Sequence, residues 1–111
     1  MAYDQRLAER IRNLIGLDPE MTEKAMFGGL AFLVNGHMAI AASGHGGILV
    51  RVDPADSMSL VNTTPAELME MRGRKMAGWL RVDADEIQDD TELEKWVHLG
   101  IEYVRTLPPK E

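Results

Sequence analysis

The sequence predicts an α+β domain of two layers: a mostly antiparallel sheet of about five strands, helices at both termini and one short central helix. Three observations carry this prediction. Two segments, 4–15 and 93–104, repeat apolar residues at helical spacing. An Asn-Gly pair at 35–36 separates two apolar runs, which is the strongest local signal of a β-hairpin. The helices are too few and too badly placed to cross over between parallel strands, so the sheet must be mostly antiparallel.

The bulk composition is that of one ordinary globular domain. The 111-residue chain is 45% hydrophobic and 27% charged, which is typical of folded proteins, and we expect a single domain over residues 1–111. It contains no cysteine, which excludes a disulfide framework, a thiolate metal site and a cysteine nucleophile. The start of the chain has no signal-peptide pattern, and no apolar run approaches the roughly 20 residues of a spanning helix. We therefore expect a cytoplasmic protein that does not enter a membrane.

The first predicted elements are a helix and a hairpin. An amphipathic helix is expected over about residues 4–15, and Gly16 supplies its stop. The hairpin follows because Asn35 and Gly36 both tolerate the positive φ of a type I′ turn. Its strands are the apolar runs 26–34 and 38–42. A two-residue loop sets the cross-strand pairs as Val34 with His37, Leu33 with Met38, Phe32 with Ala39, and Ala31 with Ile40.

Both faces of this hairpin are mainly apolar. An antiparallel sheet normally leaves one face in water, so two apolar faces each need a cover. Helices could supply it, and so could a second copy of the chain. We interpret the pattern as a sign of self-association and expect a homodimer.

The middle of the chain predicts a strand and a short helix. A glycine-rich, flexible connection over 44–47 leads into an apolar strand over 48–52. Asp53 and Pro54 then match a helix start, because a carboxylate caps the free N–H groups and proline fits the first helical position. This helix is expected to run to about residue 61.

The segment from 64 to 82 predicts a turn and a hairpin. Thr64 and Glu67 follow the capping-box pattern and favour one further helical turn. A chain reversal is expected over 72–74, and a strand over 76–82 carries Trp79.

The last helix has the clearest pattern. One apolar stripe at helical spacing contains Leu93, Trp96, Val97, Gly100, Ile101 and Val104. Thr91 and Glu94 form a second capping box, with Asp89 and Asp90 favourable near the positive helix end. Pro108 prevents continuation.

Four blocks of the sequence resemble a known family in the same order. The stretch 23–36, which contains Met26-Phe27-Gly28-Gly29, is similar to the opening strand and hairpin of the TfoX N-terminal domain family. The blocks 49–53, 72–82 and 93–97 resemble later parts of its stand-alone, single-domain members. The resemblance implies a two-layer fold with an antiparallel sheet. Longer members carry a second, helical domain and regulate DNA uptake and competence genes.

Patterns of catalysis and cofactor binding are missing. The glycines at 28–29 and 44–47 lack the spacing of phosphate-binding loops. His37, His45 and His98 lack metal-ligand spacing, although the glycines around His45 leave its ring accessible. The acidic residues 83–90 are interpreted as helix caps and a solvated loop. We expect no cofactor, no metal and no enzymatic activity.

Basic and methionine residues give two readings of a binding surface. Arg72, Arg74, Lys75 and Arg81 flank one predicted hairpin with Trp79, an arrangement that could grip single-stranded nucleic acid or an acidic protein surface, or could merely protect a sheet edge. The methionines, among them Met26, Met38, Met58, Met69, Met71 and Met76, could line a partner groove or simply fill the core. The candidate binding residues are Lys24, Phe27, His45, Arg72, Arg74, Lys75 and Trp79.

Three functional hypotheses follow. The first is a non-enzymatic regulatory domain that contacts another protein. The second is a nucleic-acid module built on Arg72, Arg74, Lys75 and Trp79, which the net charge of −6 disfavours. The third is an enzyme that depends on a small ligand or metal.

Overall fold

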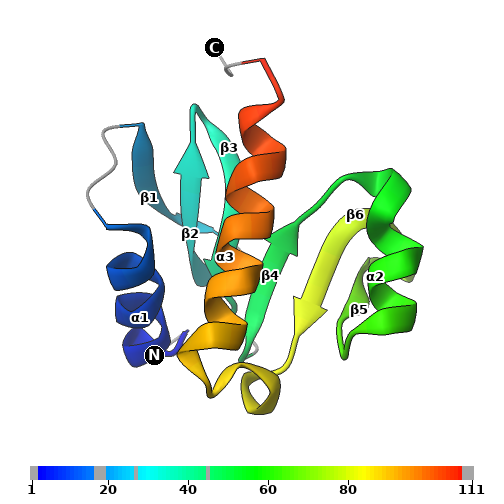
Figure 1. Cartoon of the computed structure of the whole chain (residues 1–111), viewed down its shortest axis with the longest axis horizontal. Coiled ribbons are helices and arrows are strands. Elements are labelled where there is room, and N and C mark those ends of the chain that lie inside the picture. The colour runs from blue at the N-terminus through cyan, green and yellow to red at the C-terminus, as the bar shows by residue number, and fades with distance from the viewer. Residues whose placement is uncertain (1–2, 17–19, 27, 45, 109–111) are drawn as a thin grey trace.

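The computed structural model describes residues 3–16, 20–26, 28–44 and 46–108, and it confirms the predicted α+β class. Within these residues the helices lie on one face of an antiparallel sheet (Figure 1). The α-helices are α1 (Gln5–Ile15), α2 (Ser57–Thr63) and α3 (Asp90–Arg105). The strands are β1 (Met21–Met26), β2 (Gly29–Val34), β3 (His37–Ala42), β4 (Ile48–Arg51), β5 (Glu67–Met71) and β6 (Arg74–Val82), in the spatial order β1-β2-β3-β4-β6-β5.

The two terminal helices form where the sequence predicts them. Asp4 caps α1, because its Oδ1 accepts hydrogen bonds from the backbone N–H groups of Arg6 and Leu7 at 2.9 and 3.2 Å. Gly16 ends the helix with φ +73°. All six residues of the predicted apolar stripe of α3 are buried. The capping box predicted for α3 is wrong, since Asp89 is the N-cap and accepts from Thr91 N–H at 2.9 Å.

Helix α3 lies directly on the backbone of β3. A methyl group built at Gly100 would overlap with the carbonyl oxygen of Ala39. Glycine in mid-helix costs about 1 kcal/mol relative to alanine. It is used here because only a residue without a Cβ lets helix and strand approach this closely.

The hairpin turn is confirmed, and its far register is corrected. Asn35 and Gly36 have φ +53° and +87°, as a type I′ turn requires. Val34 pairs with His37 and Leu33 with Met38 as predicted. Beyond them the predicted pairing is wrong by one residue, since Phe32 pairs with Ile40 and Ala31 with Ala41. A β-bulge inserts Ala39 there, so Ala39 and Ile40 both join the core under the helices.

The sheet has six strands rather than about five because the sequence reading missed β1. The apolar run predicted as one strand from residue 26 is divided, and β2 begins only at Gly29. Strand β1 is an edge strand whose four central residues are exposed. Its polar side chains therefore lack the apolar alternation that indicates a half-buried strand.

The central helix begins as predicted, but the segment after it differs from the prediction. Asp53 caps a short 3₁₀ turn, Pro54–Asp56, by accepting from Ala55 N–H at 2.9 Å, and α2 follows as expected. The capping box predicted at Thr64 is wrong. The Thr64 hydroxyl donates to the Leu60 carbonyl at 2.6 Å and so closes the end of α2, and Glu67 begins β5.

A bulge interrupts the pairing of β6 with β5 and bends the strand. Leu80 pairs with Leu68, but Met76 pairs with Met69, so three residues of β6 have no counterpart in β5. Gly78 lies in this bulge with φ +87°. Its N–H donates to the buried Ser57 hydroxyl at 2.6 Å, and its carbonyl accepts from Val52 N–H at 2.8 Å. The start of α2 therefore holds the bend.

Of the helices in the described ranges, none has the length and apolar character needed to cross a bilayer.

A candidate binding cavity on the open face of the sheet

The sheet has two apolar faces with different covers. The main core unites α1, α2 and α3 with one face of the sheet. A second cluster lies apart from it, and every member comes from a strand. We call the face that carries this second cluster the open face. Its buried members are Ala31, Met38, Ala41 and Leu49, and its partly buried members are Met26, Leu33, Met69 and Trp79.

The cover of the open face comes from the edges of the same sheet. Met26 at the end of β1 and Met69 on β5 pack against the buried members of the second cluster. The sequence predicts helices or a second copy of the chain over each apolar face. Helices cover one face as expected, whereas the open face is covered in part by residues of the chain's own edge strands.

A cavity of about 320 Å³ opens between these edges. Its lining includes three methionines, two arginines and one glutamate. The lining residues are Met26, Gly29, Met38, Ala41, Ala42, Ser43, Gly44, Leu49, Met69, Glu70, Arg72 and Arg81.

The floor of the cavity depends on close packing at Gly29. A methyl group built there would overlap with the carbonyl oxygen of Ala42. Gly28, just before it, has φ +77°, which side chains rarely adopt. The glycine pair therefore serves the turn into β2 and the close approach of β2 to β3.

Charged side chains surround the apolar floor. Arg72 and Arg81 line the cavity together with Glu70. Lys24 pairs with Ala31, a buried member of the second cluster, so its side chain starts on the same face. Among the described residues, none of Lys24, Arg72 and Arg81 belongs to an ion pair. The cavity therefore combines methionine side chains with two guanidinium groups and one carboxylate, so its lining carries one more positive than negative charge.

Two arginines of the helical layer, in contrast, form ion pairs within the chain. Arg12 of α1 makes a two-pronged contact with Glu23 of β1, with distances of 2.6 and 2.7 Å. This hydrogen bonding lowers the pKa of the Glu23 carboxyl and raises that of Arg12. Arg10 contacts Asp90 at 2.8 Å. On this side of the molecule the chain supplies its own carboxylates.

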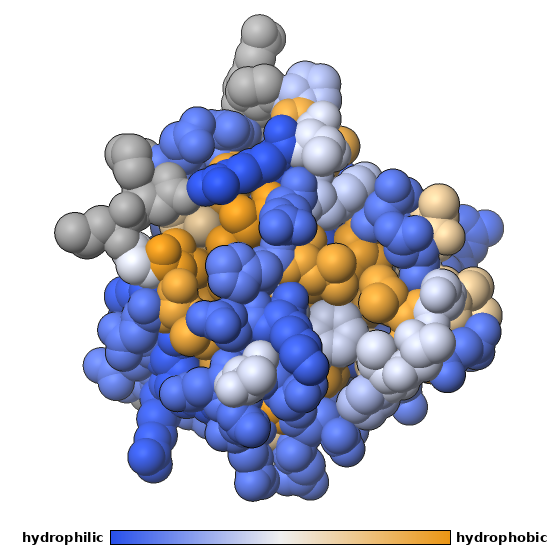
Figure 2. Space-filling view, viewed as in Figure 1, coloured by the Kyte–Doolittle hydropathy of each residue, from blue (hydrophilic) through white to orange (hydrophobic). Residues whose placement is uncertain are grey.

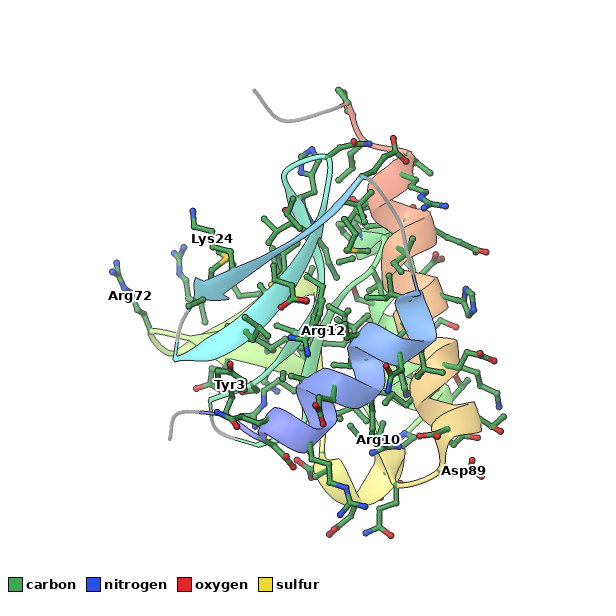
Figure 3. The ribbon with its side chains drawn as sticks, turned by 90° about the vertical axis from the view of Figure 1, so that its left-hand side faces the viewer. Tyr3, Arg10, Arg12, Lys24, Arg72 and Asp89 are labelled. Atoms are coloured by element: carbon green, nitrogen blue, oxygen red, sulfur yellow. The ribbon has the colours of Figure 1, made fainter. Side chains whose placement is uncertain are left out.

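The candidate binding residues do not all lie together. Lys24 and Arg72 project away from the helical layer (Figure 3). Arg74 and Lys75 are exposed at the start of β6. Trp79 lies beyond the bend and is half-buried, with the Arg51 guanidinium 5.1 Å from its ring centroid. Phe27 and His45 lie outside the described residues.

Trp79 is therefore not presented at the hairpin tip with the basic side chains. The arrangement in which bases would stack on tryptophan beside arginine requires an accessible ring. Arg51 occupies one position over that ring, and it also lies 5.9 Å from the Tyr103 ring centroid. Trp79 belongs instead to the wall of the second cluster.

Sequence reasoning missed Arg51 as a residue of this region. Its guanidinium donates to His37 Nδ1 at 3.5 Å, and His37 Nε2–H donates to the Pro108 carbonyl at 2.7 Å. These contacts fasten the turn between β2 and β3 to the segment after α3. No local pattern around Arg51 indicates such a role, since it depends on three segments that are distant in sequence.

A second hollow of about 420 Å³ lies between α2 and α3. Figure 2 shows apolar side chains between these two helices. Its lining includes Leu60, Pro65, Trp96 and Leu99 with Glu92 and Lys95 at the rim. The rim charges neutralise each other, because Lys95 Nζ lies 3.2 Å from Glu92 Oε1. This hollow has one cation and one anion, whereas the cavity of the open face has two arginines and one glutamate.

Comparison with known proteins gives one match. The family model described as the TfoX N-terminal domain matches residues 13–104, most of the chain and every strand of the sheet. No curated protein and no solved structure matches.

Proposed function

The chain belongs to the TfoX N-terminal domain family, and on that basis we propose that it is a non-enzymatic regulatory domain that acts in the cytoplasm by binding another protein. The resemblance to competence regulators supports a role in the control of gene expression. The observation that carries the proposal is the apolar, methionine-lined cavity on a sheet face over which no described helix packs. Flexible methionine side chains adapt to differently shaped partners, which suits a protein-binding surface.

A pull-down from an extract of the cells that express the protein tests this function. The immobilised domain is expected to retain at least one protein that a Met69→Glu variant does not, because the new carboxylate would be buried at the contact. A His98→Glu variant is the matched control, since His98 is exposed on α3 in the opposite layer. Far-UV circular dichroism verifies the fold of both variants. Retention of the same proteins by all three forms, or of none by the original domain, would contradict the proposal.

As the alternative occupant of the open face we propose a second copy of the chain, in a homodimer that would exclude the partner protein from the cavity. Met26, Leu33, Met69 and Trp79 remain partly exposed there, and a second copy would cover them. Pairing through the edge of β1 is disfavoured. Two copies of β1 that pair antiparallel about a two-fold axis place one residue opposite its own copy. The two arrangements that pair most of the strand centre on Glu23 or on Lys24, and each sets like charges opposite each other.

Sedimentation equilibrium is the measurement for the homodimer. The original domain is expected to sediment with twice the chain mass, and Met69→Glu with the mass of one chain, because it buries a charge in the shared contact. Ala25→Glu alters the β1 edge on the side of the helices, since Ala25 is exposed and pairs with Leu30, which packs against the main core, and it leaves the open face intact. If Ala25→Glu rather than Met69→Glu changed the mass, or if the original domain were monomeric, the homodimer proposed here would be wrong.

A further inference from the structure

We propose that the cavity of the open face binds an acidic peptide segment of the protein partner, with an aliphatic side chain of that segment inserted among the methionines. This inference rests on the proposed function and adds the chemistry of the partner. It commits to a peptide because one hollow offers an apolar floor beside two arginines and a single glutamate, an excess of positive charge.

The size and lining of the cavity set the apolar part of the ligand. A volume of about 320 Å³ lies at the small end of the range of roughly 300–1,000 Å³ that ligand pockets occupy. It suits one or two aliphatic side chains rather than a large cofactor. Met38, Ala41 and Leu49 close the floor, each at most 6% exposed. Met26 and Met69 stand at the sides with unbranched side chains that can adjust to the inserted group.

The arginines of the open face determine the polar part of the proposed peptide ligand. Arg10 and Arg12 in the helical layer are each held by a carboxylate of the same chain. Arg72 and Arg81 have no such carboxylate among the described residues, although both line the cavity. A guanidinium binds a carboxylate through paired, charge-assisted hydrogen bonds. Glu67 lies opposite Arg81 in the strand pairing and Glu70 lines the same cavity, but within the described ranges neither forms an ion pair with an arginine there. An acidic side chain of a partner would supply that paired contact.

The same cavity also contains features that limit the ligand. Glu70 lines it with the two arginines, so a ligand with many carboxylates would meet repulsion. The net charge of −6 repels acidic molecules at long range, but salt screens charges beyond about 8 Å at physiological ionic strength. Short segments that combine one or two acids with an aliphatic residue therefore fit best. A phosphate backbone would leave the apolar floor unused.

A library of random seven-residue peptides displayed on phage tests the proposal with the intact domain. Enriched peptides are expected to combine Asp or Glu with Leu, Ile, Val or Met. A synthetic copy of an enriched peptide is then titrated. Its Kd is expected to rise about tenfold in Arg81→Gln or Arg72→Gln, because each loses a charge-assisted pair. Arg74→Gln removes an exposed cation that does not line the cavity, and it is expected to change Kd less than twofold.

Methyl resonances of the methionines locate the bound peptide. Met26, Met38 and Met69 are expected to shift, whereas Met58 on α2, which is 56% exposed and outside the second cluster, is the internal control. Neutral or basic peptides that shift the three open-face methyls would overturn the acidic ligand while leaving the proposed function intact. Peptides that bind without shifting them, or a library without enrichment, would count against the open face itself. Binding of a single-stranded oligonucleotide that Arg72→Gln abolishes would overturn the peptide ligand in favour of nucleic acid.

Discussion

Replacing Phe32 with alanine is expected to lower the free energy of unfolding by about 3–5 kcal/mol, the range measured for fully buried phenylalanines. Phe32 is 1% exposed and is the largest fully buried side chain of the core under the helices. Its removal would leave a cavity that the helices cannot fill without moving off the sheet. Urea denaturation followed by circular dichroism measures the loss.

The neighbouring residue provides the matched control for Phe32. Leu33 follows it in β2 but belongs to the second cluster on the open face, where it is half-buried. Leu33→Ala is expected to cost less than about 2 kcal/mol, because the side chain already contacts solvent and leaves no closed cavity. Equal losses for the two variants, or a larger loss for Leu33→Ala, would contradict the assignment of the two faces.

Replacing Gly47 with alanine is expected to lower the free energy of unfolding by roughly 2–5 kcal/mol. Gly47 has φ +69°, and a methyl group there would overlap with the backbone carbonyl of Val82. The left-handed conformation costs a side chain about 1–2 kcal/mol, and overpacking against backbone costs about 1–3 kcal/mol more. Thermal unfolding monitored by circular dichroism would show a lower midpoint.

Gly46 separates the two causes of this loss. It shares a positive φ of +89°, but a methyl group there would meet nothing within 4 Å. Gly46→Ala is therefore expected to cost only the conformational part, about 1–2 kcal/mol. A cost at Gly46 equal to that at Gly47 would show that packing against β6 contributes nothing.

The sequence predicted the helices and the first hairpin turn because local physics determines them. Gly16 acts only at the end of α1, and the apolar stripe lies wholly within α3. The Asn35-Gly36 turn depends on the φ preference of two residues. The predicted register failed at the Ala39 bulge, which leaves no local mark in the sequence. The connection over 44–47 was read as flexible, yet Gly47 packs against the end of β6, a contact between segments 35 residues apart.

The predictions for the edge strand β1 and for the helix caps were wrong for related reasons. Strand β1 has polar side chains because it is exposed at the edge, so no apolar alternation indicates it. The capping-box pattern matches at Thr64, and its hydroxyl does accept from Ala66 N–H at 3.2 Å. The same hydroxyl also donates to the Leu60 carbonyl at the end of α2, and a strand rather than a helix follows. Asp89 was recognised as favourable for α3 but not as its cap. The same polar residue types cap the start of a helix and close its end, and they often occur at neighbouring positions. The sequence therefore does not say which residue is the cap, whereas the observed helix boundaries do.

The candidate site was predicted only in part. The sequence singled out the basic residues of the β5–β6 hairpin and left the methionines as either groove or core, and one cavity brings Arg72 and Arg81 to Met26, Met38 and Met69. That these residues bind a partner stays a prediction. Their meeting depends on the strand order β4-β6-β5 and on the bend at Gly78, which no local pattern encodes. Trp79 was grouped with the hairpin tip because the bend that separates them could not be foreseen.

The claim that the open face is a partner-binding surface is tested most directly by methyl NMR of the domain with a protein that it retains from the cell extract. The account predicts that the Met26, Met38 and Met69 methyl resonances shift on addition of that protein while the Met58 resonance stays in place. Shifts confined to Met58, or unchanged methyl resonances at a saturating concentration of the protein, would contradict it.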